Sequence, residues 1–174
     1  MGFDIERFRT VRLRAERLAP RHLAELVAMH RDPAVMETLG GVRTPAATED
    51  YLAANLKHWD EHGFGLWMLY DWDGGFAGRG CIRRAELDGA DEVEIGYAFR
   101  RPYWGRGLAS EFARACVAIG FTALGLDDLV AIATPDNLAS RRVMEKTGLR
   151  FEKTFDYNGI PSVLYRILRA APAA

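Results

Sequence analysis

The chain has 174 residues, a length typical of one domain with a sizeable hydrophobic core. It is 49% hydrophobic and 27% charged, as ordinary globular proteins are, and its formal net charge of −1 provides no field to attract nucleic acid or a membrane surface. No apolar run reaches the roughly 18 residues of a membrane span. Cys81 and Cys116 lie in apolar stretches without metal-ligand spacing, so we expect reduced core thiols, no metal site and a cytoplasmic protein.

Strand and helix patterns alternate in the first half of the chain. Pro20 favours the first turn of one helix, and a second helix is bounded by an N-cap at Thr44 and a stop at Gly63. The sequence DGG at 73–75 predicts a hairpin turn between two strands. The expected elements are a strand at 10–15, helices at 20–30 and 44–63, and strands at 66–71 and 76–83.

The second half continues the alternation and ends in a hairpin around Asn158-Gly159. Asp136 or Asn137 caps the last helix, and the apolar run LVAIAT before it is typical of a central strand. A single mixed α/β domain is therefore expected over 1–174, with its core at about 10–168 and a frayed C-terminal tail. The expected elements are strands at 92–99, 129–134, 150–156 and 162–168 and helices at 107–124 and 137–147.

The segment YWGRGLASE (103–111) places two glycines directly before a helix. A strand, a glycine turn and a helix in this order present backbone N–H groups to an anion such as a pyrophosphate. The segment has no Walker A lysine motif, and Ser110 stands where a dinucleotide fingerprint needs glycine, so nucleoside triphosphates and NAD are disfavoured. Taken alone, the glycines fit an ordinary tight turn equally well.

A second unit, PDNLASRRVMEKTGLRF (135–151), fits a well-capped helix when it is considered alone. Together, the two units resemble the GNAT superfamily of N-acetyltransferases, and within it the branch of the ribosomal-protein N-terminal acetyltransferases. EIGYAFRRPYWGRGLASE is similar to that branch's EIGYWLDPEYWGKGYATE, and NLASRRVMEKTGLRF is similar to its NxxSxRVxEKxGF. The resemblance runs from Thr10 to Ile167. It implies a mixed, mostly antiparallel sheet of about seven strands flanked by about four helices.

The resemblance also implies that acetyl-CoA is the co-substrate and that no metal takes part. In this family the backbone amides of the glycine turn hold the pyrophosphate, and the end of the preceding strand pairs with the pantetheine arm. The second unit contributes further contacts. The coenzyme positions implied are Ala98, Phe99, Trp104, Gly105, Arg106, Gly107, Leu108, Ala109, Ser110, Asn137 and Ser140.

Transfer of an acetyl group to an amine needs a base and a proton donor for the leaving thiolate. Glu94 shares one face of its strand with Gly96 and Ala98, which leaves room for a substrate, and it matches the family's strand Glu. A solvated strand residue is the alternative interpretation. Much of the superfamily donates the proton from a tyrosine where this chain has Met144, so Ser140 is the expected donor, with a plain helix position as the alternative.

The acceptor is expected to be a primary amine of a protein N-terminus or a small molecule. Trp59 and Tyr97 are the expected acceptor contacts beside Glu94, although buried aromatic residues are more often part of a core. His58 and His62 fit a polar helix end better than a metal site. Homodimers are common in the branch that the chain resembles. Two other functions stay open, a non-catalytic acyl-CoA-binding module and a nucleotide-binding regulatory domain.

Overall fold

A single eight-stranded sheet organises the chain, whose computed structural model describes residues 4–170. The strand order is β1-β2-β3-β4-β5-β6-β8-β7, and all neighbours are antiparallel except β5 and β6, which are parallel. The expected mixed, mostly antiparallel sheet is confirmed. The strands are β1 (Arg7–Arg9), β2 (Arg14–Arg17), β3 (Leu66–Tyr70), β4 (Phe76–Leu87), β5 (Ala90–Phe99), β6 (Asp128–Ala133), β7 (Arg150–Tyr157) and β8 (Ile160–Leu168).

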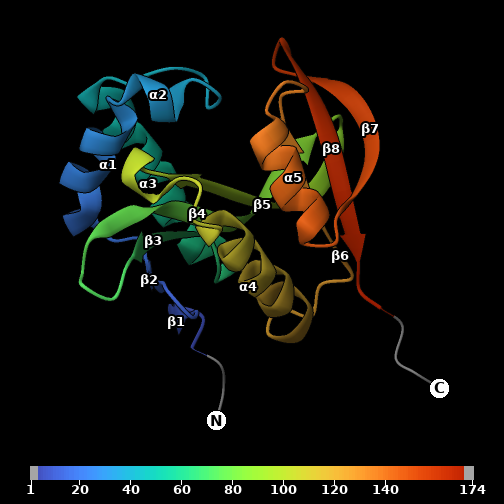
Figure 1. Cartoon of the computed structure of the whole chain (residues 1–174), viewed down its shortest axis with the longest axis horizontal. Coiled ribbons are helices and arrows are strands. Elements are labelled where there is room, and N and C mark those ends of the chain that lie inside the picture. The colour runs from blue at the N-terminus through green and yellow to red at the C-terminus, as the bar shows by residue number, and fades with distance from the viewer. Residues whose placement is uncertain (1–3, 171–174) are drawn as a thin grey trace.

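Five α-helices pack against this sheet in the described part of the chain. Figure 1 shows α1, α2 and α3 gathered at one end of the molecule and α5 beside β6, β7 and β8 at the other, with α4 between them. None of these helices is long and apolar enough to cross a membrane. The helices are α1 (Leu23–His30), α2 (Pro33–Met36), α3 (Pro45–His62), α4 (Leu108–Thr122) and α5 (Leu138–Lys146).

The ends of the longer helices follow from local side-chain chemistry. The Thr44 hydroxyl accepts the N–H of Ala47 at 3.1 Å and caps α3, which ends at Gly63 with φ of 73°. The Asn137 side chain accepts the N–H of Ser140 at 3.1 Å and caps α5. These boundaries agree with the expected ones because capping depends on neighbouring residues rather than on tertiary contacts.

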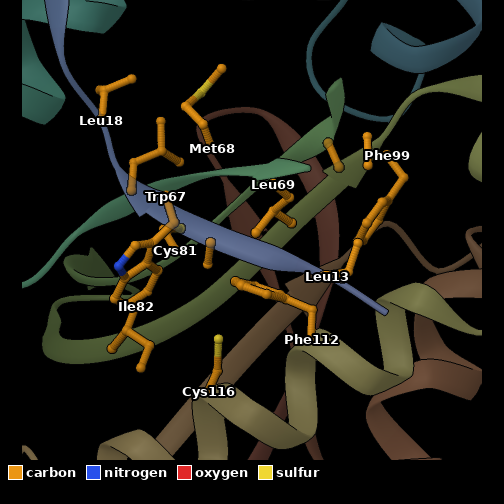
Figure 2. Packing of buried hydrophobic residues seen from close by; sticks show 14 of the residues in the cluster. Leu13, Leu18, Trp67, Met68, Leu69, Cys81, Ile82, Phe99, Phe112 and Cys116 are labelled. Atoms are coloured by element: carbon orange, nitrogen blue, oxygen red, sulfur yellow. The ribbon is translucent and has the colours of Figure 1, made fainter. Parts of the chain in front are cut away.

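The core lies between the sheet and α4, whose apolar stripe faces the strands. Phe112 and Cys116 project from α4 toward Trp67 and Ile82, and all four side chains are buried (Figure 2). Gly80 of β4 lets the helix approach closely, since a Cβ there would lie 2.2 Å from the Phe112 ring. α4 therefore covers the sheet face on which a side chain at position 80 would lie.

The opposite face of β4 and β5 lies toward α3. Arg79 follows the alternation to this face, and its guanidinium stacks on the Tyr51 ring of α3 at 4.9 Å from the centroid. Arg83 pairs with Glu94 across β4 and β5, and Cys81 pairs with Gly96. One sheet face thus carries charged groups near α3, while the other carries the apolar contacts of α4.

The sheet opens between β5 and β6. Glu94 and Val130 are the one ladder pair that joins these strands within the described residues, although each strand continues for several residues beyond it. On the N-terminal side of this pair, Arg166 of β8 holds both strands, since its guanidinium bonds Glu92 at 2.7 and 2.9 Å and also contacts Asp128. The strands are clamped at one end and separate at the other.

A few expectations about the fold were wrong in detail. The opening strand starts at Arg14 rather than at position 10, and the helix expected from Pro20 begins with a 3-10 turn before α1. β1 and α2 were not expected, because three and four residues are too few to carry a periodic pattern. Positions 171–174 of the tail expected to fray lie outside the described residues.

Candidate active site

The glycine turn presents unused backbone donors at the start of α4. Gly105 and Gly107 have φ of 72° and 75°, the left-handed region that favours glycine, and Gly107 is the N-cap without a side-chain cap. The first bonded amide is that of Glu111, which donates to the Gly107 carbonyl at 3.1 Å. No acceptor among residues 4–170 takes the N–H groups that precede it, those of Arg106, Gly107, Leu108, Ala109 and Ser110.

A brace from the β1–β2 connection fixes this turn. Arg12 donates to the carbonyl of Arg106 and to the Glu111 carboxylate, both at 2.7 Å, and the Thr10 hydroxyl donates to the same carboxylate at 2.5 Å. Burial alone would raise the pKa of Glu111, but the hydrogen bonds from Thr10 and Arg12 hold it below its usual value. The brace neutralises an acidic group that would otherwise face an incoming anion.

The end of β5 offers one residue to a ligand in the opening beside β6. The Arg100 N–H donates to Ala77 of β4, and the Ala98 carbonyl also points toward β4, since it lies 2.2 Å from a Cβ built on Gly78. The N–H and carbonyl of Phe99 therefore point away from β4. Ala98 was expected to share this pairing, but its carbonyl faces the neighbouring strand.

Trp104 closes the corner between this strand and the turn. Its ring is half-exposed, and its indole N–H donates to the Phe99 carbonyl at 2.6 Å. The Phe99 N–H is left as the free backbone donor at this end of the opening. Trp104 thus fixes the end of the strand, and its contact with the coenzyme stays a prediction.

Glu94 lies on the α3 face, almost fully buried at 5% exposure. Its carboxylate accepts two bonds from the Arg83 guanidinium, at 2.9 Å from Nε and 2.8 Å from Nη2. The Glu94 charge raises the pKa of Arg83, so this guanidinium stays a cation. Gly96 lies on the same face, and the Cys81 thiol of β4 packs beside it, 3.0 Å from a Cβ built on Gly96. The expected room for a substrate beside Glu94 stays a prediction.

Tyr97 and Ser140 meet on the opposite sheet face. The Tyr97 hydroxyl lies 3.1 Å from the Ser140 hydroxyl, and burial raises the pKa of Tyr97 to about 12. Tyr97 was expected beside the acceptor, whereas the structure places its hydroxyl at α5. Met144, at the position where a tyrosine is common, is buried against Leu149 and Val163 and has no role at this hydroxyl pair.

Two aromatic helix positions have structural roles. Trp59 was expected to contact the acceptor, but it is 2% exposed and its indole donates to the Leu66 carbonyl at 2.8 Å. That expectation was wrong because the stripe of α3 that includes Trp59 packs on β3. The two nitrogens of His58 bond the Phe64 carbonyl and the Arg84 N–H, which holds the end of α3 against β4.

Sequence reasoning missed the residues around Glu94. Tyr51, Arg79 and Arg83 lie on its face of the sheet, and a further guanidinium, that of Arg43, stacks on Tyr51. The strand pattern FAGRGCIRR contained a signal, because alternation puts Arg79 and Arg83 on one face with Cys81. Which strand pairs with this one, and in which register, could not be read from the local pattern.

Comparisons with known proteins agree with this geometry. A model described as an acetyltransferase (GNAT) domain matches residues 12–150. The protein YkkB of Bacillus subtilis is 33% identical over 158 residues, which cover 90% of this chain and 92% of that protein. The crystal structure of an acetyltransferase from Agrobacterium tumefaciens has a TM-score of 0.83 at 25% identity and covers 97% of this chain and 98% of that chain.

A third comparison includes a bound coenzyme. RimL, a ribosomal-protein N-acetyltransferase solved in complex with coenzyme A, has a TM-score of 0.76 at 17% identity and covers 91% of this chain and 95% of that chain. At this identity the likeness concerns the fold alone. The domain model spans most of the sequence, and the chain belongs to the GNAT acetyltransferase family.

Proposed function

We propose that the protein transfers the acetyl group of acetyl-CoA to a primary amine by direct attack. The observation that carries the proposal is the opening between β5 and β6, with the unused amides of the α4 N-terminus near its end. A pyrophosphate is the anion that such a helix start accommodates best. A nucleotide-binding regulatory domain, the alternative drawn from the glycine turn alone, has no support from the family to which the chain belongs.

The coenzyme would use backbone groups in preference to side chains. Its pyrophosphate would accept from the amides of Arg106 to Ser110, and its pantetheine arm would pair with the Phe99 N–H in the opening. Asn137, already the cap of α5, would border the arm from the other side. The thioester would then lie near Glu94, where the two strands separate.

The two sheet faces separate the two proton transfers. On the α3 face, Glu94 would take a proton from the ammonium group, directly or through a water molecule. The amine nitrogen then attacks the thioester carbon, the C–S bond breaks, and the sulfur leaves as a thiolate. On the α5 face, Ser140 would give a proton to that thiolate and regain one from solvent through the Tyr97 hydroxyl, 3.1 Å away. The new amide nitrogen would release its second proton to solvent.

The acceptor and the setting are part of the same proposal. RimL acts on a ribosomal protein, and an acceptor of that kind or a small amine would approach from the α3 face, where Glu94 lies. A cytoplasmic location and a homodimer fit the two buried free cysteines and the resemblance. The acceptor, the location and the homodimer are proposals that do not follow from the geometry of the coenzyme site.

The test measures free thiol released from acetyl-CoA with a panel of primary amines. We expect thiol release that depends on both the amine and the protein, and a fall in kcat of roughly ten- to ten-thousand-fold in Glu94→Gln at unchanged acetyl-CoA affinity. Glu86→Gln, an exposed position of β4, is the matched control and keeps full activity. Tight acetyl-CoA binding without thiol release for any amine would instead support a non-catalytic acyl-CoA-binding module.

A further inference from the structure

Three arginines converge on the sheet face that carries Glu94, and two of them lack an anionic partner. Arg83 pairs with Glu94. Arg79 is 8% exposed, and its Nε is buried without a hydrogen-bond partner. Within residues 4–170, no carboxylate and no hydrogen-bond acceptor contacts the guanidinium of Arg79 or that of Arg43. A buried cation without an anion is costly, because burial removes its hydration without a replacement.

Tyr51 provides the main compensation for these two charges. The guanidinium carbons of Arg43 and Arg79 lie 4.6 and 4.9 Å from the centroid of its ring. A cation–π contact offsets part of the lost hydration but leaves the N–H donors unused. Two cations beside one ring also repel each other, and both burial and the Arg79 charge lower the pKa of Arg43. The arrangement is therefore incomplete without an anion.

His30 is a further buried polar group beside Tyr51. Its ring is fully buried beside Tyr51, with centroids 5.0 Å apart, and its Nδ1 lies 3.1 Å from the Thr48 hydroxyl. Its Nε2 has no partner within the described residues, like the Nε of Arg79. Two buried polar atoms thus lack partners around a single tyrosine.

We propose that Arg79 and Arg43 form an anion-binding subsite for the acceptor, which selects small primary amines that also carry a carboxylate or phosphate group. The inference rests on the proposed function, since it assigns the substrate class of the same site. The anion of the acceptor would bond the unused donors of Arg79, with Arg43 at the more exposed side. Its amine would then lie toward Glu94, which is on the neighbouring strand β5, four residues from Ala98, the residue opposite Arg79.

The coenzyme is not the anion that these arginines bind. Arg79 follows the alternation of β4 to the α3 face, whereas the unused amides for the pyrophosphate begin α4, which packs on the other face. The Glu94 carboxylate does not neutralise the cluster either, because Arg83 already holds it. The sequence carries a net charge of −1 overall, so this local excess of positive charge is a property of the site.

The experiment compares amines that differ only in the anion. Thiol release from acetyl-CoA is measured with an amino acid and its carboxamide, and with phosphoethanolamine and ethanolamine. We expect kcat/KM to be roughly ten- to hundred-fold higher for the charged member of at least one pair, the range for hydrogen bonds to a charged group. The pair that responds distinguishes a carboxylate from a phosphate ligand.

Substitutions test whether Arg79 and Arg43 cause the preference for anionic amines. We expect Arg79→Met to remove this preference, while the activity with the neutral amine of the pair stays within a few-fold of the wild type. Arg43→Met, at a half-buried position, weakens it even if Arg79→Met does not fold. The matched control is Arg150→Met, which removes an exposed guanidinium on β7 and keeps the preference. A second readout without acetyl transfer is the Nε–H NMR resonance of Arg79, which shifts on titration with inorganic phosphate or acetate.

The outcomes separate this inference from the proposed function. Equal kcat/KM for charged and neutral amines, with no effect of Arg79→Met, overturns the subsite and leaves acetyl transfer in place. A peptide with a blocked carboxyl group that surpasses every small anionic amine overturns it as well. A shift of the Arg79 resonance without thiol release for any amine supports the subsite and contradicts acetyl transfer. An unmoved resonance together with no anion preference overturns the subsite.

Discussion

The role proposed for Glu94 depends on its neighbours. Its carboxylate is almost buried, and the two bonds from Arg83 fix its orientation. A carboxylate bound to one cation accepts a proton less readily than a free one, but it holds an ammonium group or an ordered water well. In the proposed reaction, Arg83 would position Glu94, and Glu94 would remove the proton or orient the amine.

Cys81 lies on the same face as Glu94, opposite Gly96, which is a place where a nucleophile would be looked for. Burial raises the pKa of Cys81, and burial also raises the pKa of Cys116, so both thiols stay protonated. We predict that the Cys81→Ala, Cys116→Ala double variant keeps its kcat, with a loss of about 1–2 kcal/mol of stability for each small cavity. Steady-state kinetics checks the rate, and denaturant unfolding checks the stability.

Mass spectrometry tests whether Cys81 forms a covalent acetyl intermediate. Wild-type protein mixed with acetyl-CoA alone should show no acetylated cysteine, and the kinetics should follow a ternary-complex pattern. A trapped acetyl-cysteine with ping-pong kinetics would replace direct attack by a covalent route.

At the scale of elements, the start of α4 links the glycine turn to the coenzyme. Gly107 has φ of 75°, and a Cβ there would lie 3.6 Å from the Arg12 guanidinium, so the fold has room for a methyl group. We predict that Gly107→Ala lowers acetyl-CoA affinity at least about tenfold, because the methyl group and the strained turn displace the amides from the pyrophosphate. Calorimetric titration with acetyl-CoA measures it.

The control for Gly107 is Gly125→Ala. Gly125 follows α4 with φ of 65° and has nothing within 4 Å of an added Cβ, so its backbone strain is comparable, about 1 kcal/mol, at a place without coenzyme contacts. Equal affinities of the two variants for acetyl-CoA would remove the phosphate role from the turn.

Arg166 holds the strands together at the closed end of the opening between β5 and β6. This residue bonds Glu92 and Glu152 and also contacts Asp128, so one guanidinium joins four strands, and the bond to Glu92 is the first cause of its raised pKa. We predict that Arg166→Met destabilises the protein by about 1.5–3 kcal/mol, since it leaves three carboxylates beside one another. Denaturant unfolding measures this loss.

Arg169→Met is the matched control for Arg166. Arg169 contacts Asp127 alone, at an exposed position near the end of β8, and its replacement should change stability by less than about 1 kcal/mol. Equal losses in both variants would mean that the Arg166 cluster contributes no more than a surface ion pair.

For the whole molecule, the parts that could be predicted from sequence are those with local causes. The bounds of α3 follow from Thr44 and Gly63, and the strand–turn–helix order around 103–111 follows from alternation and glycine. The resemblance of both units then added the family, which the domain match confirms. No tertiary information was needed for these steps, because caps and turns are determined by residues within a few positions of each other.

The parts that could not be predicted depend on register and on which face a helix covers. The stripe of α3 contains both Tyr51 and Trp59, and only the packed structure shows that Trp59 lies on β3 while Tyr51 lies beside Arg79. The pairing of Arg83 with Glu94 depends on the register of β4 and β5, which no local pattern specifies. The arginine cluster therefore became visible only in the folded chain.

The positive cluster should also make the stability of the whole molecule sensitive to acid. Burial, and then the charges of Arg79 and Arg43, lower the pKa of His30 from 6.5 to about 3. Between these two pH values the unfolded chain binds a proton that the folded chain refuses, so stability is full above pH 6.5 and falls as the pH falls toward 3. The loss between pH 7.5 and 5 is at most about 2 kcal/mol.

We therefore predict that His30→Asn, which removes the titrating ring, shows a smaller loss of unfolding free energy between pH 7.5 and 5 than the wild type does. Urea unfolding at the two pH values measures the difference, and the carboxylates cancel because they are common to both proteins. Val11→Asn, which introduces the same residue at an exposed position without a titrating group, is the control and should keep the wild-type pH dependence. An identical loss in wild type and His30→Asn would mean that His30 is protonated as readily in the folded chain as in the unfolded one. The region around Tyr51 would then lack the excess positive charge that the unpartnered guanidiniums of Arg43 and Arg79 imply.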